Sequence, residues 1–398
     1  MNASSSTASL AAIAACGVAI RALLFFHSSA SASGSAIFFG LNTFDSLKET
    51  AFARKHGGVA SAVIGSSPRV LLALERFSEH TGGVVDTREG EREMTFWVLT
   101  AVDVCIAVCL WISARAHQKG VPYLGPSFVA ASYLLNPLTV LSTQALSFQA
   151  FTRCVYSMML ATSGWILMPL AAVLLQVSSH PLMAITVVLP AMHTFACGPE
   201  KRYILLSVSF LIGVCGFYAL IEAWIRHTLG DKPTPWPGGA DVDLLTPNIG
   251  LFWYLFTQIF DRFEYMFHFI FNGHVYLYVI PLWLHLYRQP HGLLTAHIAI
   301  VVLFQPHPTV CDFAYLISLL LLHHDIVRRL GSFSFIVLVA SVSLSIMPVM
   351  ACLWLDRNTG NANFVYFQHL IHHSACGVLL AEWLREIHQR DSQPATDK

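Results

Sequence analysis

Long apolar runs separated by short polar segments dominate this chain. A helix needs about 20 apolar residues to cross roughly 30 Å of hydrocarbon. The runs that approach this length predict spans at residues 8–26, 95–114, 127–148, 155–177, 181–197, 203–225, 264–287, 333–355 and 364–384. Shorter apolar stretches at 247–260, 292–304 and 309–323 are candidate half-helices or further spans. The pattern predicts an all-α, polytopic membrane protein with ten to twelve transmembrane helices.

The runs divide one polytopic domain, residues 1–398, into successive parts. These are a first span (1–26), a polar loop that we expect to be luminal (27–94), a transmembrane block (95–225), a connection rich in proline and glycine (226–244), a second block (245–385) and a tail (386–398). Apolar residues recur at helical spacing at 44–54 and 70–77 of the first loop, which predicts helices lying on the membrane surface. The first run carries Arg21 and no basic segment before it, so we interpret it as a retained span rather than a cleaved signal.

The composition agrees with a membrane protein surrounded by lipid. Hydrophobic residues make up 55% of the 398 residues and charged residues only 12%, too little polar surface for a water-soluble globule of this size. The 23 basic and 23 acidic residues balance, and no basic block is present, which argues against a nucleic-acid partner. The nine cysteines are scattered through apolar segments without a CxxC pair, so neither a disulfide framework nor a zinc site is indicated.

The stretch 245–256 is the most informative part of the chain. Pro247, Asn248 and a glycine interrupt an apolar, aromatic sequence that continues with Phe252 and Trp253. An unpaired backbone amide in hydrocarbon costs several kcal/mol, so protein, water or a ligand must replace the lost hydrogen bonds. The break therefore predicts the border of a binding site, although the aromatic residues alone also suit an interfacial belt.

Two further polar interruptions lie in the second block. Pro306 and Pro308 break the chain just before Asp312, and Asn361 and Asn363 stand where a helix begins. Ionisable and polar groups at membrane depth are costly and usually functional, which makes these residues candidate ligand contacts. Capping of the following helices is the alternative for all three polar side chains.

Nineteen histidines are an unusual number, and His369, His372 and His373 fall on one helical face. That spacing suits a metal ion or a haem edge, but no HExxH motif and no second set of ligands accompany it. We favour hydrogen bonding between helices, and we expect no metal and no cofactor.

Enzyme signatures are missing from the sequence. There is no GxSxG, GxxxxGK[ST] or GxGxxG motif. GT-C glycosyltransferases carry an acidic residue shortly after the first span, whereas this chain has no carboxylate there before Asp45. Glycosyl transfer would therefore depend on Asp45, Glu49 or another first-loop carboxylate. A transporter would also use broken helices, but neither an inverted repeat nor a ladder of intramembrane charges is present.

Four runs together carry a resemblance to a known family. They are Leu245 to Phe256, Pro306 to Asp312, Asn361 to Phe364 and Tyr133 to Ser142. In order and spacing, across residues 125–385, they resemble the PIG-U family, the multi-spanning subunits of the glycosylphosphatidylinositol (GPI) transamidase. The N-terminal quarter is less similar, and Ser67 stands where the family has an acidic residue.

The resemblance implies a GT-C-like helical scaffold in the endoplasmic reticulum membrane that holds a glycolipid and does no glycosyl transfer. It also implies partner subunits, one of them cysteine-protease-like, which would form the thioester that the GPI amine attacks. The implied GPI contacts are Asn248, Phe252, Trp253, Asp312, Asn361 and Asn363, with Pro247 and Pro308 shaping the site. A mannosyltransferase that uses a dolichol-phosphate sugar is the alternative.

Overall fold

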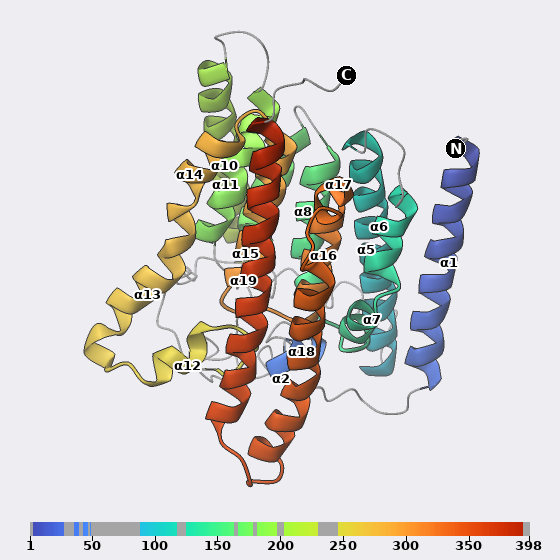
Figure 1. The fold of residues 1–398 in the computed structure, drawn as a ribbon, viewed down its shortest axis with the longest axis vertical. Coiled ribbons are helices and arrows are strands. Elements are labelled where there is room, and N and C mark those ends of the chain that lie inside the picture. Colours follow the sequence, from blue (N-terminus) through green and yellow to red (C-terminus); the bar gives the residue numbers. More distant parts are fainter. Residues whose placement is uncertain are drawn as a thin grey trace.

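The structure, a computed structural model, describes residues 3–27, 36–39, 43–46, 48, 88–117, 125–162, 166–177, 181–196, 203–229 and 246–392. Regular structure in these ranges is α-helical, which confirms the helical class predicted from the apolar pattern (Figure 1). An isolated antiparallel bridge joins Thr43 to Ser147. The predicted surface helix at 70–77, most of the one at 44–54 and most of the proline-rich connection lie outside the described residues.

The helices are, in chain order, α1 (Ala3–His27), α2 (Ala36–Phe39), α5 (Arg88–His117), α6 (Pro126–Leu134), α7 (Pro137–Gln144), α8 (Gln149–Ala161), α9 (Leu167–Val177), α10 (Pro181–Ala196), α11 (Tyr203–Leu229), α12 (Phe252–Thr257), α13 (Asp261–Leu277), α14 (Val279–Leu286), α15 (Pro290–Phe304), α16 (Val310–Leu321), α17 (His324–Val327), α18 (Phe333–Leu355) and α19 (Ala362–Ser392). Helix α1 begins and α19 ends at the same end of the molecule (Figure 1). Helix α19 also continues into the segment that the sequence suggested as a polar tail.

Four segments among the described residues are long and apolar enough to cross a membrane. They are Ser6–His27, Glu89–Ala116, Phe269–Leu286 and Phe333–Leu355. Shorter apolar helices cover Leu167–Gln176, Met183–Thr194, Val208–Ile221, Pro290–Phe304 and Val310–Leu321. These helices are those of a membrane protein, and the count of ten to twelve crossings stays a prediction.

One predicted span, 127–148, is divided into the two short helices α6 and α7. Asn136 separates them with extended backbone, and its side-chain oxygen accepts a hydrogen bond from the Leu138 amide at 3.0 Å. Pro137 has no amide hydrogen and disfavours helical backbone at the residue before it, so one helix ends and another begins here. The apolar run predicted the location of this segment but not its division.

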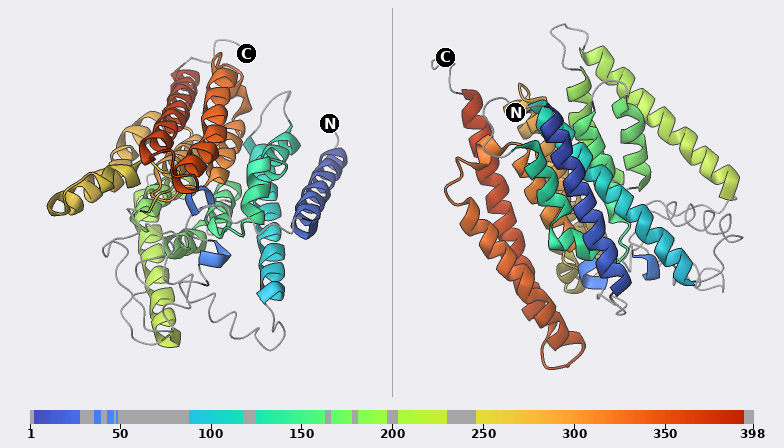
Figure 2. Two further views of the ribbon diagram at one scale, coloured as in Figure 1. Left: turned by 90° about the horizontal axis from the view of Figure 1, so that it is seen from below. Right: turned by 90° about the vertical axis from the view of Figure 1, so that its right-hand side faces the viewer.

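Helices α15 and α16 form the centre of the bundle. Every residue of α15 from Gly292 to Leu303 is buried, and the helix packs against α10, α14, α16 and α19. A helix that is apolar on all sides is stable only when other helices surround it. Helices α18 and α19 pack side by side as an antiparallel hairpin, seen along its length in Figure 2.

The loop of this hairpin is closed by backbone hydrogen bonds. Asn358 takes the left-handed conformation at φ 55°, which asparagine tolerates better than most residues. The amide of Gly360 then donates to the Leu353 carbonyl at 3.0 Å, satisfying a carbonyl at the end of α18. This turn places the start of α19 next to α12.

A buried ion pair connects the N-terminal helices α1 and α5. The Arg21 guanidinium lies 3.4 Å from Asp103 of α5, and both side chains are almost fully buried. Thr143 and Tyr133 donate to the same carboxylate at 2.6 and 2.8 Å, and Arg21 donates to the Leu134 carbonyl at 2.8 Å. A charge inside an apolar bundle needs such partners, which explains how Arg21 is tolerated within a span.

Candidate functional site

The two proline breaks of the second block meet in space. A Cβ added to Gly250 would lie 2.6 Å from Asn248 Oδ1, 3.0 Å from the Pro306 carbonyl oxygen and 3.0 Å from Pro308 Cδ. Only glycine allows so close an approach between the segment before α12 and the loop between α15 and α16. The sequence singled out these two breaks separately, and the structure brings them together.

Asn248 holds the first break through its side-chain amide. Its Oδ1 accepts a hydrogen bond from the Gly250 amide at 2.6 Å, and its Nδ2 donates to the Thr246 carbonyl at 3.0 Å. The same Nδ2 lies 3.3 Å from His307 Nδ1, across the contact between the two loops. The buried side chain therefore satisfies backbone groups of this non-helical segment.

Asp312 holds the second break. It forms a capping box with Thr309 at the start of α16, with the Thr309 amide donating to its carboxylate at 2.7 Å. Gln305 donates to the same oxygen at 2.6 Å, and the Arg153 guanidinium donates to the other at 2.9 Å. The capping alternative from the sequence is confirmed, and the carboxylate has protein partners on both oxygens.

Arg153 of α8 is a buried partner of the candidate site that sequence reasoning missed. Its side chain is almost completely buried, and its ion pair with Asp312 joins helices 159 residues apart in the chain. The available signal was an arginine between two apolar runs, in a chain that has carboxylates such as Asp103 and Asp312 at membrane depth. A buried cation needs a buried anion, but the sequence does not say which one.

The aromatic residues that follow the first break pack into two clusters that diverge at α12. Phe252 stacks on Phe271 of α13 with ring centroids 5.3 Å apart. Trp253 turns toward the α18–α19 hairpin, where it stacks on Trp354 at 6.1 Å and its indole nitrogen lies 3.5 Å from His369 Nδ1. Both α12 side chains are buried, so they wedge this short helix between its neighbours.

The start of α19 closes over α12. Tyr366 stacks on Tyr254 at 4.5 Å, and its hydroxyl donates to the Leu251 carbonyl at 3.0 Å, where the first break ends. The Tyr254 hydroxyl donates to Asn363 Oδ1. These contacts join the third candidate segment to the first.

The two candidate asparagines lie at the open edge of this assembly. Asn361 Oδ1 accepts a hydrogen bond from the Asn363 amide at 3.1 Å, which confirms that Asn361 caps α19. Both side chains are exposed, unlike those of Asn248 and Asp312. We call Tyr254, Asn361 and Asn363 the rim. We call Asn248, Asp312, Pro247 and Pro308, together with the residues that they contact, the frame.

The histidines on one face of α19 contact backbone carbonyl groups. His372 Nδ1 lies 3.0 Å from the Ala340 carbonyl of α18, and His373 Nδ1 lies 3.0 Å from the His369 carbonyl. Within the described ranges, no group of three or more histidine, cysteine or acidic side chains is arranged to hold a metal ion. The histidines at these positions link α18 to α19 and stabilise α19 itself.

Of the first-loop carboxylates that glycosyl transfer would need, Asp45 is described and Glu49 lies outside the described residues. Asp45 Oδ2 lies 3.8 Å from the Arg92 guanidinium at the start of α5. The contact ties the loop to the bundle.

Comparison with known proteins bears on the same segments. The GPI-anchor transamidase component PIGU of Homo sapiens is 27% identical over 260 residues, covering 61% of this chain and 58% of the human protein. The protein of the same name from Cricetulus griseus is 28% identical over a match of the same extent. The GPI transamidase component GAB1 homolog of Schizosaccharomyces pombe is 27% identical over 321 residues, covering 78% of this chain and 76% of the yeast protein.

The matched part of this chain thus spans somewhat more than half the length of the mammalian relatives, 58%. A model of the family described as GPI transamidase subunit PIG-U matches residues 15–372, which include the rim, the frame and the Arg21–Asp103 ion pair. That match covers nearly the whole chain and confirms the resemblance seen in the four sequence runs. The chain belongs to the PIG-U family of GPI transamidase subunits.

Proposed function

We propose that this chain is a non-catalytic subunit of the GPI transamidase that binds the GPI lipid and presents it for attachment to the C-terminus of proproteins. Membership of the PIG-U family and the names of the relatives support the assignment to that complex. The supporting structural observation is the junction of three polar interruptions, at residues 246–251, 305–309 and 361–366, next to an exposed pair of asparagines.

The rim supplies the contacts for the glycan and phosphate of the lipid. The exposed amides of Asn361 and Asn363 offer both donors and acceptors to sugar hydroxyls, and Tyr254 offers an aromatic face beside them. Trp253 lies behind the rim, with its ring 5.6 Å from that of Tyr254, and Phe252 packs on Phe271 of α13. This combination of apolar walls and a few convergent polar groups is what a glycolipid requires.

The frame holds the rim in place. The polar atoms of Asn248 and Asp312 form hydrogen bonds with the two broken backbone segments, which contain Pro247 and Pro308, and Asp312 also accepts a hydrogen bond from Arg153. We therefore propose that Asp312 contributes to GPI binding by fixing the loop between α15 and α16, and that the rim amides make the direct contacts.

In this proposal a partner subunit carries out the transamidation chemistry. A cysteine-protease-like subunit would form a thioester with the proprotein, and the ethanolamine amine of GPI would attack it. Holding the amine next to the acyl-enzyme contributes part of the roughly 7–11 kcal/mol available from proximity and orientation. The setting is the endoplasmic reticulum membrane, with a GT-C-like scaffold of ten to twelve crossings, which exceeds the four long spans among the described residues.

The combined substitution of Asn361→Ala and Asn363→Ala tests the rim. We expect GPI attachment to a reporter proprotein to fall about tenfold, the equivalent of roughly 1.4 kcal/mol from two lost hydrogen bonds, while the other subunits co-purify as before. Gln289→Ala is the matched control, because it removes an amide where α15 begins, at the opposite end of the bundle (Figure 1). Wild-type attachment in the double variant would remove the two amides from the site.

A further inference from the structure

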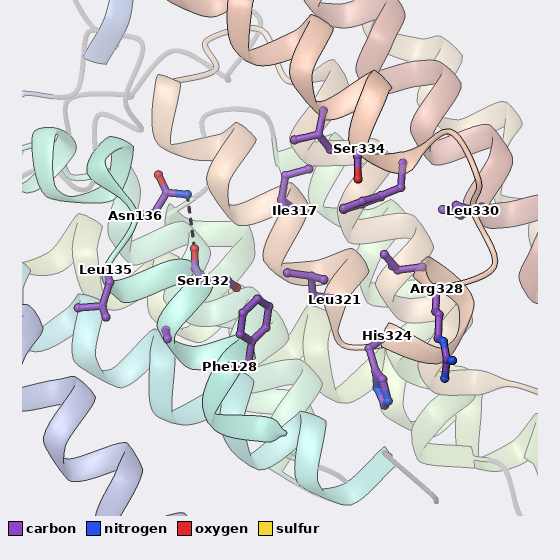
Figure 3. A pocket seen from close by; sticks show the side chains of 14 residues that line it. Phe128, Ser132, Leu135, Asn136, Ile317, Leu321, His324, Arg328, Leu330 and Ser334 are labelled. Carbon is purple, nitrogen blue, oxygen red and sulfur yellow. Dashed lines mark hydrogen bonds between the residues drawn. The ribbon is translucent and has the colours of Figure 1, made fainter. Parts of the chain in front are cut away.

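A hollow lies away from the rim and frame, between α6 and the helices α16, α17 and α18. It has a volume of about 770 Å³, within the range of small-molecule sites. Apolar side chains make most of its wall, among them Phe128, Leu135, Ile317 and Leu321 (Figure 3). We call it the α6–α18 groove.

The groove has one cationic end. His324 and Arg328 lie next to each other there, whereas Leu135 and Asn136 lie at the other end (Figure 3). The Nδ1 of His324 is buried and has no hydrogen-bond partner among the described residues. Arg328 is the one ionised side chain among the described residues that line the groove, so the charge that faces an occupant at this end is positive.

The surroundings of the groove are those of a lipid-facing surface. Phe128 of its wall is 47% exposed, and Phe335 and Leu338 on α18 beside it are 69% and 59% exposed. On a membrane-spanning helix such side chains contact acyl chains. An occupant therefore reaches the groove from the bilayer, with its apolar part along the wall and its polar part at the cationic end.

The position of the groove separates it from the rim. Helix α17 lies toward the end of the bundle where α1 begins and α19 ends, whereas α12 lies toward the opposite end (Figure 1). The headgroup of an occupant would thus belong to the other leaflet from the one that faces the rim. Basic pockets between transmembrane helices are typical sites for anionic lipid headgroups.

We propose that the α6–α18 groove binds an anionic glycerophospholipid, with an acyl chain along the apolar wall and the phosphate beside Arg328 and His324. Arginine matches a phosphate geometrically because its planar guanidinium can donate two parallel hydrogen bonds. The site is separate from the proposed GPI site, and its occupant is a lipid of the surrounding membrane.

The test measures lipid retained on the full chain, purified with its co-purifying subunits, by native mass spectrometry. Phosphatidylserine and phosphatidylcholine with identical acyl chains are the two probes. We expect the wild-type protein to prefer phosphatidylserine about fivefold, the contribution of one arginine near a headgroup. Arg328→Gln should abolish this preference, whereas Arg328→Lys should keep most of it.

Arg329→Gln is the matched control, because Arg329 is the next residue, is exposed and does not line the groove. It should leave the preference unchanged. Ala131→Phe fills the apolar wall and should lower retention of both lipids, which tests the groove even if Arg328→Gln fails to fold. Equal retention of the two lipids by the wild-type protein, equal loss in the two glutamine variants, or full retention in Ala131→Phe would each overturn the proposal.

Discussion

At the scale of single residues, the carboxylate of Asp312 combines two roles. It caps α16 through Thr309 and it neutralises Arg153, and both groups are buried. Removing one member of a buried ion pair leaves an unpaired charge, whereas removing both leaves none. The helix cap contributes less to the free energy of unfolding, about 1 kcal/mol.

We therefore expect Arg153→Met or Asp312→Leu alone to lower the free energy of unfolding by roughly 3–5 kcal/mol. The double variant should lose less than either single variant, because no uncompensated charge remains. Thermal unfolding followed by size-exclusion chromatography measures the effect. Arg385→Met is the matched control, since the Arg385 side chain is 66% exposed and its pair with the adjacent Glu386 contributes little. Additive losses in the double variant would contradict a coupled pair.

At the scale of elements, the contact between the two broken loops rests on the missing side chain of Gly250. Gly250→Ala places a methyl group against the Pro306 carbonyl, which belongs to backbone and cannot turn away. We expect a loss of about 1–3 kcal/mol in stability, the usual cost of overpacking, together with lower GPI attachment. The same thermal unfolding assay and the reporter proprotein provide the two measurements.

Gly216→Ala is the control for that variant. No heavy atom lies within 4 Å of a Cβ at Gly216, which is in α11. Alanine favours helix by up to about 1 kcal/mol over glycine, so this change should be neutral or stabilising. A Gly250→Ala protein as stable as the control would show that the loops separate without cost.

The breaks themselves were predictable from sequence, because proline acts locally. Pro247 and Pro308 marked the non-helical segments before α12 and α16, and Asn361 marked the start of α19, since a proline and a cap act only on their nearest residues. Helix class and the approximate location of most apolar helices followed from the same local pattern. The division of 127–148 at Asn136 was missed because the apolar run hid a cap followed by proline.

Contacts between distant elements were harder to predict from the sequence. The pairing of Arg153 with Asp312, and of Arg21 with Asp103, depends on which helices become neighbours, and no periodicity encodes that. The same limit explains why Phe252 and Trp253, both expected to contact one ligand, face two different clusters. The family resemblance suggested the site residues together, but their division into rim and frame came from the structure.

At the scale of the whole molecule, the two buried ion pairs lie on either side of a tyrosine contact. Tyr133, which donates to Asp103, packs edge-to-face on Tyr315 with ring centroids 6.0 Å apart. The Tyr315 hydroxyl lies 3.0 Å from Ser157 of α8, one helical turn from Arg153. The N-terminal helices are thereby joined to the helices that carry the frame.

Variants of the Arg21–Asp103 pair should consequently behave differently from variants of the rim. Arg21→Met should destabilise the bundle by roughly 3–5 kcal/mol, because Asp103 stays buried and unpaired. GPI attachment should then fall in proportion to the amount of folded protein, measured by fluorescence-detected size exclusion. The Asn361→Ala and Asn363→Ala double variant removes the cap of α19, which costs only about 1 kcal/mol, so it should lower attachment at a nearly unchanged amount of folded protein. If attachment per folded molecule fell equally in both, the asparagines would support the structure instead of contacting the lipid, and the assignment of the rim would have to be given up.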